Sequence, residues 1–209
     1  MFNVFKINRK FKLKGNRSLL RTDSEMMLVN KNEADNAFKL YKKQYIDTLL
    51  KSKGFLKYKS NAYVRRNQVD VLEYIDLQKE IHGSRTFTVN YALTALYIPH
   101  EFFDRDYCER MGELICKKDV WWDFANDKIA KTSFENVAKA IEVFVIPWFD
   151  SHSNNDAIKK MLSDGNVRGL KHAWLEAIDS HHSPEIIEEN VSIFGLPKLL
   201  GKESVELGS

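Results

Sequence analysis

The chain of 209 residues has only two cysteines and lacks any uninterrupted stretch of about 18 apolar residues. Two thiols, Cys108 and Cys116, do not make a disulfide framework, so we expect both to be reduced and buried as small apolar groups. The missing apolar stretch excludes a transmembrane helix, and the opening residues MFNVFKINRKFKLKGNR lack the apolar core of a signal peptide. We therefore predict a cytoplasmic protein that does not bind a membrane.

Motifs that would identify a reaction are also missing. The sequence has no G-x-S-x-G elbow, no Gly-rich phosphate loop, and no C-x-x-C or H-x-x-x-H pair of the kind that binds zinc. The metal-capable residues on two predicted turns, which are His82, His100, Glu101, Asp104 and Cys108, do not have this tight spacing. We therefore expect no cofactor and no bound metal, and the sequence favours a protein that is not an enzyme.

What the chain does contain is typical of a globular protein with a real core. Hydrophobic residues make up 44%, aromatic residues 12% and charged residues 29% of the sequence. The net charge of +3 is unevenly distributed, because residues 1–60 hold 15 lysines and arginines against 5 acidic residues. Such asymmetry can mark a nucleic-acid surface, but lysines interleaved with apolar residues are also typical of a solvated face.

The first regular element predicted is an amphipathic helix from Asn32 to Lys53. Asn32 can cap the free amides of the first turn, and Gly54 supplies a left-handed stop. Apolar residues recur at three- and four-residue spacing, so one face of the helix needs a sheet to cover. These residues are Ala34, Phe38, Tyr41, Tyr45, Ile46 and Leu49.

An antiparallel meander follows this helix. Asn67-Gln68 predicts a tight hairpin and His82-Gly83-Ser84 a second turn, while Pro99 ends the last of these strands. Alternating apolar and polar residues point two rows of side chains to opposite faces. The strands are predicted at 63–66, 69–79 and 85–98, and CERMGELI and DVWWDFA would extend the sheet to about five strands around a turn at Lys117-Lys118-Asp119.

Helices then replace strands. We predict one helix capped by Thr132 or Ser133 and stopped by Pro147, and a last one with Pro184 in its first turn. The order favours an α+β fold, with an antiparallel sheet of about five strands, helices packed on one face and a C-terminal helical segment. The predicted parts are an arm or hairpin (1–31), a core (32–150), C-terminal helices including 153–164 and 166–180 (151–200), and a tail (201–209).

Several short motifs occur in a characteristic order: KSKGF, YIDLQKE, FTVNYAL, RMGEL, and WWDF followed by IPWF. In this order the chain resembles the bacterial domain-of-unknown-function family numbered 4304, over roughly Phe38 to Phe149. The resemblance implies an α+β fold in small, mostly bacterial cytoplasmic proteins. It implies no catalytic residue, because the family brings no activity that could be transferred.

Polar and aromatic residues in the predicted strands suggest a binding surface. Gln78, Asn90 and Arg110 either pair with one another across strands or converge on an open face of the sheet. Of the adjacent Trp121 and Trp122, one ring lies under the helices, and the other needs its own cover or lines a binding face. We predict a binding or protein-interaction module that uses the sheet face around Gln78, Asn90, Arg110 and Trp122.

Two alternatives remain. The first is nucleic-acid binding through the basic N-terminal segment. The second is a hydrolase or nuclease of unrecognised type, in which Asp70, Asp76 and Lys79 hold a divalent ion, although pairing with neighbouring arginines explains the same acids. The adjacent His181 and His182 are expected near a helix end, with their rings splayed apart. The possible phosphate contacts are Lys10, Lys12, Lys14, Arg17, Lys42 and Lys43.

Overall fold

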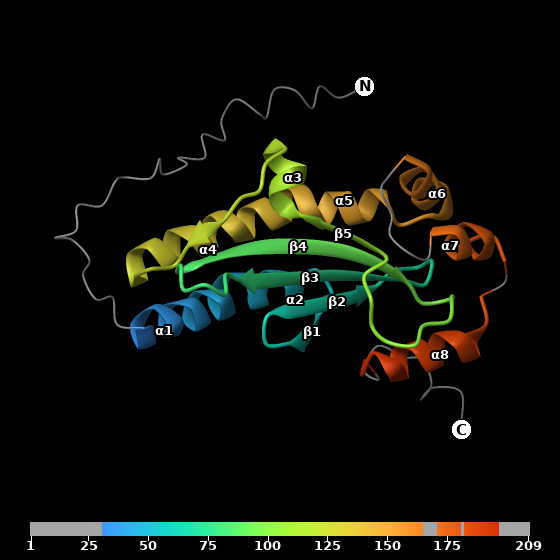
Figure 1. Ribbon diagram of the computed structural model, residues 1–209, viewed down its shortest axis with the longest axis horizontal. Helices are drawn as coiled ribbons and strands as arrows, with labels where there is room; N and C mark the ends of the chain where they lie inside the picture. Colours follow the sequence, from blue (N-terminus) through green and yellow to red (C-terminus); the bar gives the residue numbers. More distant parts are fainter. Residues whose placement is uncertain (1–30, 165–170, 181, 197–209) are drawn as a thin grey trace. The chain divides into compact units, whose positions relative to one another are not determined.

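The computed structural model describes residues 31–164, 171–180 and 182–196. These residues form an antiparallel sheet with helices packed on it, so the predicted α+β fold is confirmed (Figure 1). The predicted arm, apart from Lys31, and the predicted tail lie outside the described residues. The strands are β1 (Leu56–Lys59), β2 (Ala62–Arg66), β3 (Val71–Lys79), β4 (Thr86–Ala95), β5 (Tyr107–Arg110) and β6 (Trp122–Asp123). The helical segments are α1 (Lys31–Tyr41), η3 (Lys42–Asp47), α2 (Thr48–Ser52), α3 (Met111–Cys116), α4 (Asp127–Ala140), η4 (Ile141–Val145), α5 (Ile146–Ser151), α6 (Asn155–Asp164), α7 (Lys171–Ala177) and α8 (Pro184–Ile193).

The sheet is a meander in which β1 to β5 follow one another in space as they do in sequence. β4 is the central strand, because it pairs with β3 along nearly its whole length, with β5 near its middle and with β6 at its start. The register places Asn90 opposite Asp76 on one side and opposite Arg110 on the other. Because directly paired residues point to the same face, these three side chains share one side of the sheet.

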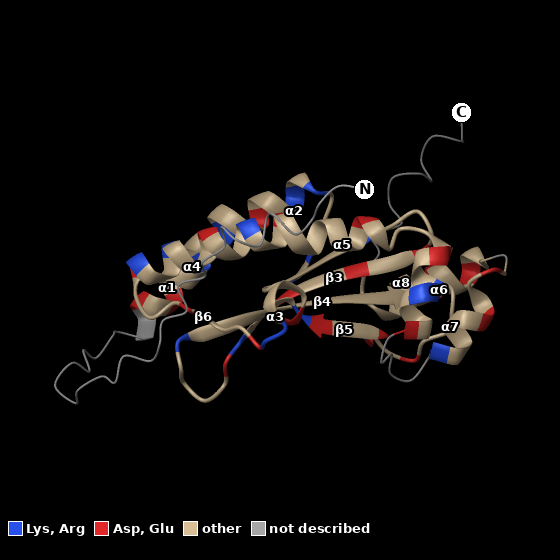
Figure 2. Cartoon of the chain, turned by 90° about the horizontal axis from the view of Figure 1, so that it is seen from above, with Lys and Arg blue, Asp and Glu red and all other residues tan. Residues whose placement is uncertain are grey.

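The opposite face of the sheet carries the main apolar core. α1, α2, α4 and α5 all lie on this side, as Figure 2 shows. Phe38 of α1 and Phe134 of α4 pack on Phe87 of β4, with ring centroids 5.4 Å and 4.8 Å from that ring. All three side chains are buried, and burial of this size is worth about 2–3 kcal/mol for each aromatic ring. We call this the helix-covered face and the other the front face.

The front face is covered only in part. The segment after β4 folds back over it, where the Phe103 ring lies 5.4 Å from the Tyr74 ring of β3. The ring of Phe194, just after α8, lies 5.1 Å from Phe103 on the far side of this segment. The Phe194–Phe103 contact therefore joins the C-terminal helical segment to the chain that crosses the front face.

The hairpin between β2 and β3 differs from the predicted two-residue turn. β3 begins at Val71 rather than Val69, and the Asn67 side chain caps the turn by accepting hydrogen bonds from the amides of Val69 and Val71, at 3.1 and 3.0 Å. The residue with positive φ is Asp70, at 58°, and not Asn67. An Asx-type turn of this kind lets the side chain replace ladder hydrogen bonds, so the loop is longer than the sequence spacing indicated.

The two shorter strands predicted from CERMGELI and DVWWDFA are both present, but each is shorter than its motif. β5 ends at Arg110 and the chain turns at once into α3, while β6 is only two residues long. Gly112 allows this turn, because a Cβ atom there would lie only 2.3 Å from the Lys118 carbonyl oxygen. Cys108 and Cys116 are exposed, so their predicted burial was wrong.

Some helix boundaries also differ from those predicted. Lys31 is already helical, α4 begins at Asp127, and its cap is Asn126 rather than Thr132 or Ser133. Pro147 does not stop the helix but lies in the first turn of α5, directly after the π-helical turn η4. A wider π turn relieves the collision between a proline ring and the carbonyl four residues earlier, so the helix continues.

The C-terminal predictions agree better with the structure. Pro184 does lie in the first turn of α8, where Ser183 caps the helix, and Gly195 has the left-handed φ of 69° beyond its end. Across the described residues, no helix is long and apolar enough to cross a membrane.

Candidate functional site

The front face brings together three of the four residues predicted to form a binding face. The Asn90 side-chain amide donates a hydrogen bond of 3.0 Å to the Gln78 side-chain carbonyl across β3 and β4. Arg110 lies opposite Asn90 on β5. Gln78 is exposed and Asn90 is buried, so the row runs from solvent toward the middle of the sheet.

Trp122 is not part of this row, because it pairs with Phe87 and its ring lies against that core residue, at 6.1 Å. The prediction that Trp122 shares a face with Gln78 was therefore wrong. Its neighbour Trp121 lies beneath Arg110 instead, with the guanidinium carbon 5.1 Å from the ring centroid. The sequence showed that adjacent tryptophans point to opposite faces, but only the register of β6 shows which one meets the helices.

Asp119 holds this arginine and tryptophan together. Its carboxylate accepts a hydrogen bond from the Arg110 guanidinium and a second, of 3.0 Å, from the Trp121 indole N–H. A cation over the face of a tryptophan is attracted by the ring quadrupole, and the shared carboxylate fixes both partners. The Arg110 side chain remains 36% exposed, so the group is presented to solvent rather than buried.

Asp76 completes the front row. Its carboxylate lies 3.5 Å from the Arg105 guanidinium, which in turn lies over the Tyr74 ring at 5.7 Å. Burial raises the pKa of Asp76, and the neighbouring Asn90 amide and Arg105 oppose this shift. We refer to Asp76, Gln78, Asn90, Arg110 and Trp121 as the front polar surface.

The residues predicted to contact phosphates differ in their exposure, and four of them are not described by the structure. Lys10, Lys12, Lys14 and Arg17 lie outside the described residues. Lys42 is only 6% exposed and donates a hydrogen bond to the Ser60 carbonyl, and burial lowers its pKa, so its proposed exposure to a phosphate was wrong. Lys43 is exposed, as that prediction requires.

The residues of the nuclease alternative do not meet. Asp70 lies in the turn before β3 and Asp76 on the front face, six residues or about 20 Å along the chain. Lys79 points to the helix-covered face, where its ammonium lies 2.8 Å from the Asp35 carboxylate. Among the residues that the structure describes, no three His, Cys, Asp or Glu side chains form a group able to hold a metal.

A buried carboxyl lies beside the front face at the end of β4. Asp106 is 4% exposed, and its carboxylate accepts a hydrogen bond of 3.0 Å from the Ala95 amide. His100 lies 4.0 Å from it, with its Nε2 atom 2.8 Å from the Ala95 carbonyl. Burial raises the pKa of Asp106 to about 7 and lowers the pKa of His100.

Replacing Asp106 with asparagine is expected to stabilise the protein above neutral pH. The folded carboxyl holds its proton up to about pH 7, whereas the unfolded one releases it near its ordinary value of 3.8, so folding loses stability as pH rises between these values. Asp106→Asn removes this loss, and the difference between the two pKa values corresponds to a gain of about 4 kcal/mol at about pH 8 that nearly disappears by about pH 4. Urea unfolding across this pH range measures it.

The matched control for that substitution is Glu101→Gln, which also removes one negative charge but at an exposed side chain. Its effect on the free energy of unfolding should be small at every pH. An Asp106→Asn protein that is less stable than the original at about pH 8 would show that the ionised carboxylate contributes more through the Ala95 hydrogen bond than burial costs.

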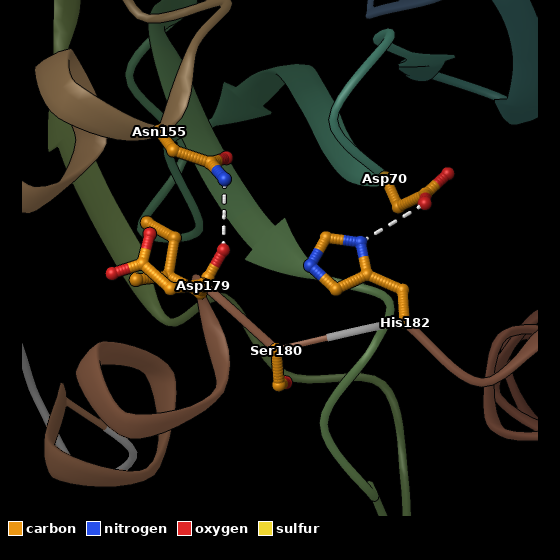
Figure 3. A pocket seen from close by; sticks show the side chains of 6 residues that line it. Asp70, Asn155, Asp179, Ser180 and His182 are labelled. Atoms are coloured by element: carbon orange, nitrogen blue, oxygen red, sulfur yellow. Dashed lines mark hydrogen bonds and ion pairs between the residues drawn. The ribbon is translucent and has the colours of Figure 1, made fainter.

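A pocket of about 420 Å³ lies near the β2–β3 turn, and no pattern in the sequence predicted it. It is lined by Asp70, Asn155, Ile178, Asp179, Ser180 and His182. Figure 3 shows the His182 ring with one nitrogen on the Asp70 carboxylate, at 3.1 Å, and the other directed across the pocket. The two residues are 112 positions apart, so no local pattern could have paired them.

A second pocket, of about 440 Å³, lies where α5 and α6 meet β5. Three rings are stacked along it: Tyr107 on Trp148 at 5.4 Å, and Trp148 on His152 at 4.2 Å. The Nδ1 atom of His152 lies 2.7 Å from the Trp148 carbonyl. The rings therefore support one another, and this pocket has a more apolar lining than the first.

Comparison with known proteins gives one family. The model of a family described as a domain of unknown function, DUF4304, matches residues 46–151, which run from the end of η3 through α5 and therefore include the whole sheet. No curated protein and no solved structure gives a match.

Proposed function

We propose, for a chain that belongs to the DUF4304 family of domains of unknown function, that the front polar surface binds another protein. The observation that carries this proposal is the group formed by Arg110, Trp121 and Asp119 on the front face. Arginine and tryptophan are the residue types that contribute most at protein interfaces, especially when neighbouring groups hold them in place. Here one carboxylate orients both side chains before any partner arrives.

The charge pattern favours a protein over a nucleic acid at this surface. Arg110 is paired with Asp119, and Arg105 with Asp76, so acidic and basic groups alternate. A surface that follows phosphates needs uncompensated positive charge, whereas mixed charges suit a complementary protein surface. An exposed aromatic residue, Phe102, which is 66% exposed, lies one residue from Phe103 on the segment that crosses this face.

The test begins with the tagged full chain as bait in an extract of its source cells. A protein that is retained is identified by mass spectrometry and produced separately, and its affinity for the chain is measured by calorimetry. We expect Arg110→Ala and Trp121→Ala each to weaken binding at least about tenfold, with the folded state checked by circular dichroism. Lys131→Ala, at an exposed position of α4 on the helix-covered side, is the control and should leave affinity unchanged.

Salt dependence separates this proposal from its alternative. The basic balance of residues 1–60 supports nucleic-acid binding through Lys10, Lys12, Lys14 and Arg17, and such binding weakens steeply as salt rises. Binding to the front polar surface should change little over the same range. Retention of nucleic acid that is lost with salt and unaffected by Arg110→Ala would replace the protein-binding proposal with this alternative.

A further inference from the structure

Asp70 is held in place from several directions at the edge of the first pocket. Its backbone adopts the left-handed conformation, with φ of 58°, and its carbonyl accepts a hydrogen bond of 2.9 Å from the Leu96 amide. One carboxylate oxygen accepts two hydrogen bonds from Arg66, at 2.9 and 2.5 Å. The second oxygen is thereby aimed at His182. A left-handed non-glycine residue carries strain, which is tolerated where surrounding contacts fix it.

The imidazole of His182 is equally fixed. Its ring stacks on Tyr97 with centroids 3.8 Å apart and planes 8° apart. Tyr97 is itself anchored, because its hydroxyl accepts a hydrogen bond of 2.6 Å from the Trp174 indole. A carboxylate beside Nδ1 retains the proton on that nitrogen in the neutral ring, so Nε2 is left with a free lone pair.

Two acceptor atoms beside the pocket have no hydrogen-bond partner. The Nε2 atom of His182 is buried and unpaired, and the Oδ1 atom of Asn155 is too. The Asn155 amide cannot easily turn to donate instead, because its Nδ2 atom already donates a hydrogen bond of 2.8 Å to the Ile178 carbonyl. Buried acceptors without partners are costly, and a group that donates hydrogen bonds to both would remove that cost.

The other polar groups of the pocket already have partners. Asp179 forms an ion pair of 2.5 Å with Lys159, and the Ser180 hydroxyl donates to the Ala177 carbonyl at 2.6 Å. Asp70 is balanced by Arg66. The charged groups of the pocket are therefore already neutralised, and the groups left to bind a ligand are hydrogen-bond acceptors. Its volume, about 420 Å³, is in the range of sites for small molecules.

We propose that this pocket binds a small molecule through N–H or O–H groups, as an amine or an alcohol would provide, with Nε2 of His182 and Oδ1 of Asn155 as the acceptors. Asp70 acts as a positioning residue that determines which imidazole nitrogen accepts. This site is separate from the front polar surface and does not depend on the protein-binding proposal.

The test follows the imidazole nitrogens of His182 by nuclear magnetic resonance in the full ¹⁵N-labelled chain. Methylammonium and ethylene glycol are the donor-bearing probes for the amine and the alcohol, and tetramethylammonium carries the same charge as the first without any donor. We expect a saturable shift of the His182 Nε2 signal with at least one donor-bearing probe and none with tetramethylammonium. Which probe is effective distinguishes an amine site from an alcohol site. His152, whose Nδ1 is already bonded, is the internal control.

The decisive variant is Asp70→Asn, since asparagine tolerates the left-handed conformation as well as aspartate does. Its amide can donate to Nδ1, which moves the imidazole proton to Nε2 and converts the acceptor into a donor. We expect the tautomer change in the spectrum and at least about tenfold weaker binding of the donor-bearing probe. Equal shifts with tetramethylammonium, no shift with either donor-bearing probe, or unchanged binding after Asp70→Asn would each overturn the proposal.

Discussion

Replacing Asn190 with leucine is expected to lower the free energy of unfolding by about 3–5 kcal/mol, or to release α8 from the rest of the fold. Asn190 is only 1% exposed, and its side-chain amide donates to the carbonyls of Leu96 and Ile98, at 2.8 and 2.6 Å. Its carbonyl oxygen accepts from the His100 amide at 3.1 Å. Leucine would leave three buried backbone groups without partners, each at a cost of about 1–3 kcal/mol.

Two measurements distinguish a loss of global stability in the Asn190→Leu protein from a local release of α8. Denaturant unfolding reports a loss of global stability, whereas hydrogen exchange of the His100 amide reports local release of α8 and should accelerate in either case. Glu189→Leu, at the exposed neighbouring position of the same helix, is the control and should change stability by less than about 0.5 kcal/mol. Slow exchange at His100 in the Asn190→Leu protein would show that water or another group replaces the amide.

Replacing Arg65 with methionine is the second substitution expected to have a large effect. Glu73 is 1% exposed on the helix-covered face, and the Arg65 guanidinium donates to its carboxylate at 2.5 Å. The same guanidinium donates to the Lys53 carbonyl at 2.9 Å and so ties β2 to the end of α2. Removing one partner of a buried ion pair leaves an uncompensated charge, at a cost of about 3–5 kcal/mol.

The cost of Arg65→Met should depend on pH. Burial raises the pKa of Glu73 and Arg65 opposes that shift, so without the arginine the folded carboxyl holds its proton still more tightly. The unfolded carboxyl ionises near its ordinary value of 4.5, and the destabilisation should therefore be small below that pH and grow toward neutrality. Unfolding curves at about pH 4 and about pH 7 compare the two.

A double substitution is the control for this pair. Arg65→Met combined with Glu73→Leu removes both charges and fills the site with apolar groups, which is often nearly neutral for stability. We expect it to recover most of the loss at neutral pH and to lose the pH dependence. If the double variant is as unstable as Arg65→Met, the important contact is the one from Arg65 to Lys53 rather than the ion pair.

Much of the fold was determined by local sequence pattern. The alternation of residues along β4 and the three- and four-residue apolar spacing of α1 are properties of neighbouring residues, so they predicted a sheet covered by helices on one face. Glycine correctly predicted the end of a helix where no distant contact competes, as at Gly54 and Gly195. The family resemblance rests on the same local motifs and was also confirmed.

Boundaries failed where distant residues compete with local preference. The strand-like MGELI became α3 because Gly112 lets the segment after it approach closely, and Pro147 stays within a helix because η4 widens the turn before it. The face of Trp122 followed from its pairing with Phe87, which no periodicity within a two-residue strand could reveal.

By itself, the sequence determined which segments could become strands and helices and which residues within a strand share a face, because these depend on contacts a few residues apart. Only the tertiary structure decided which face of the sheet is covered only in part and which distant side chains meet. Asp70 and His182 come together because the β2–β3 turn and the chain before α8 are brought to the same end of the sheet. A contact of this kind depends on how whole helices and strands pack together, and the packing energy comes from residues that are far apart in the sequence.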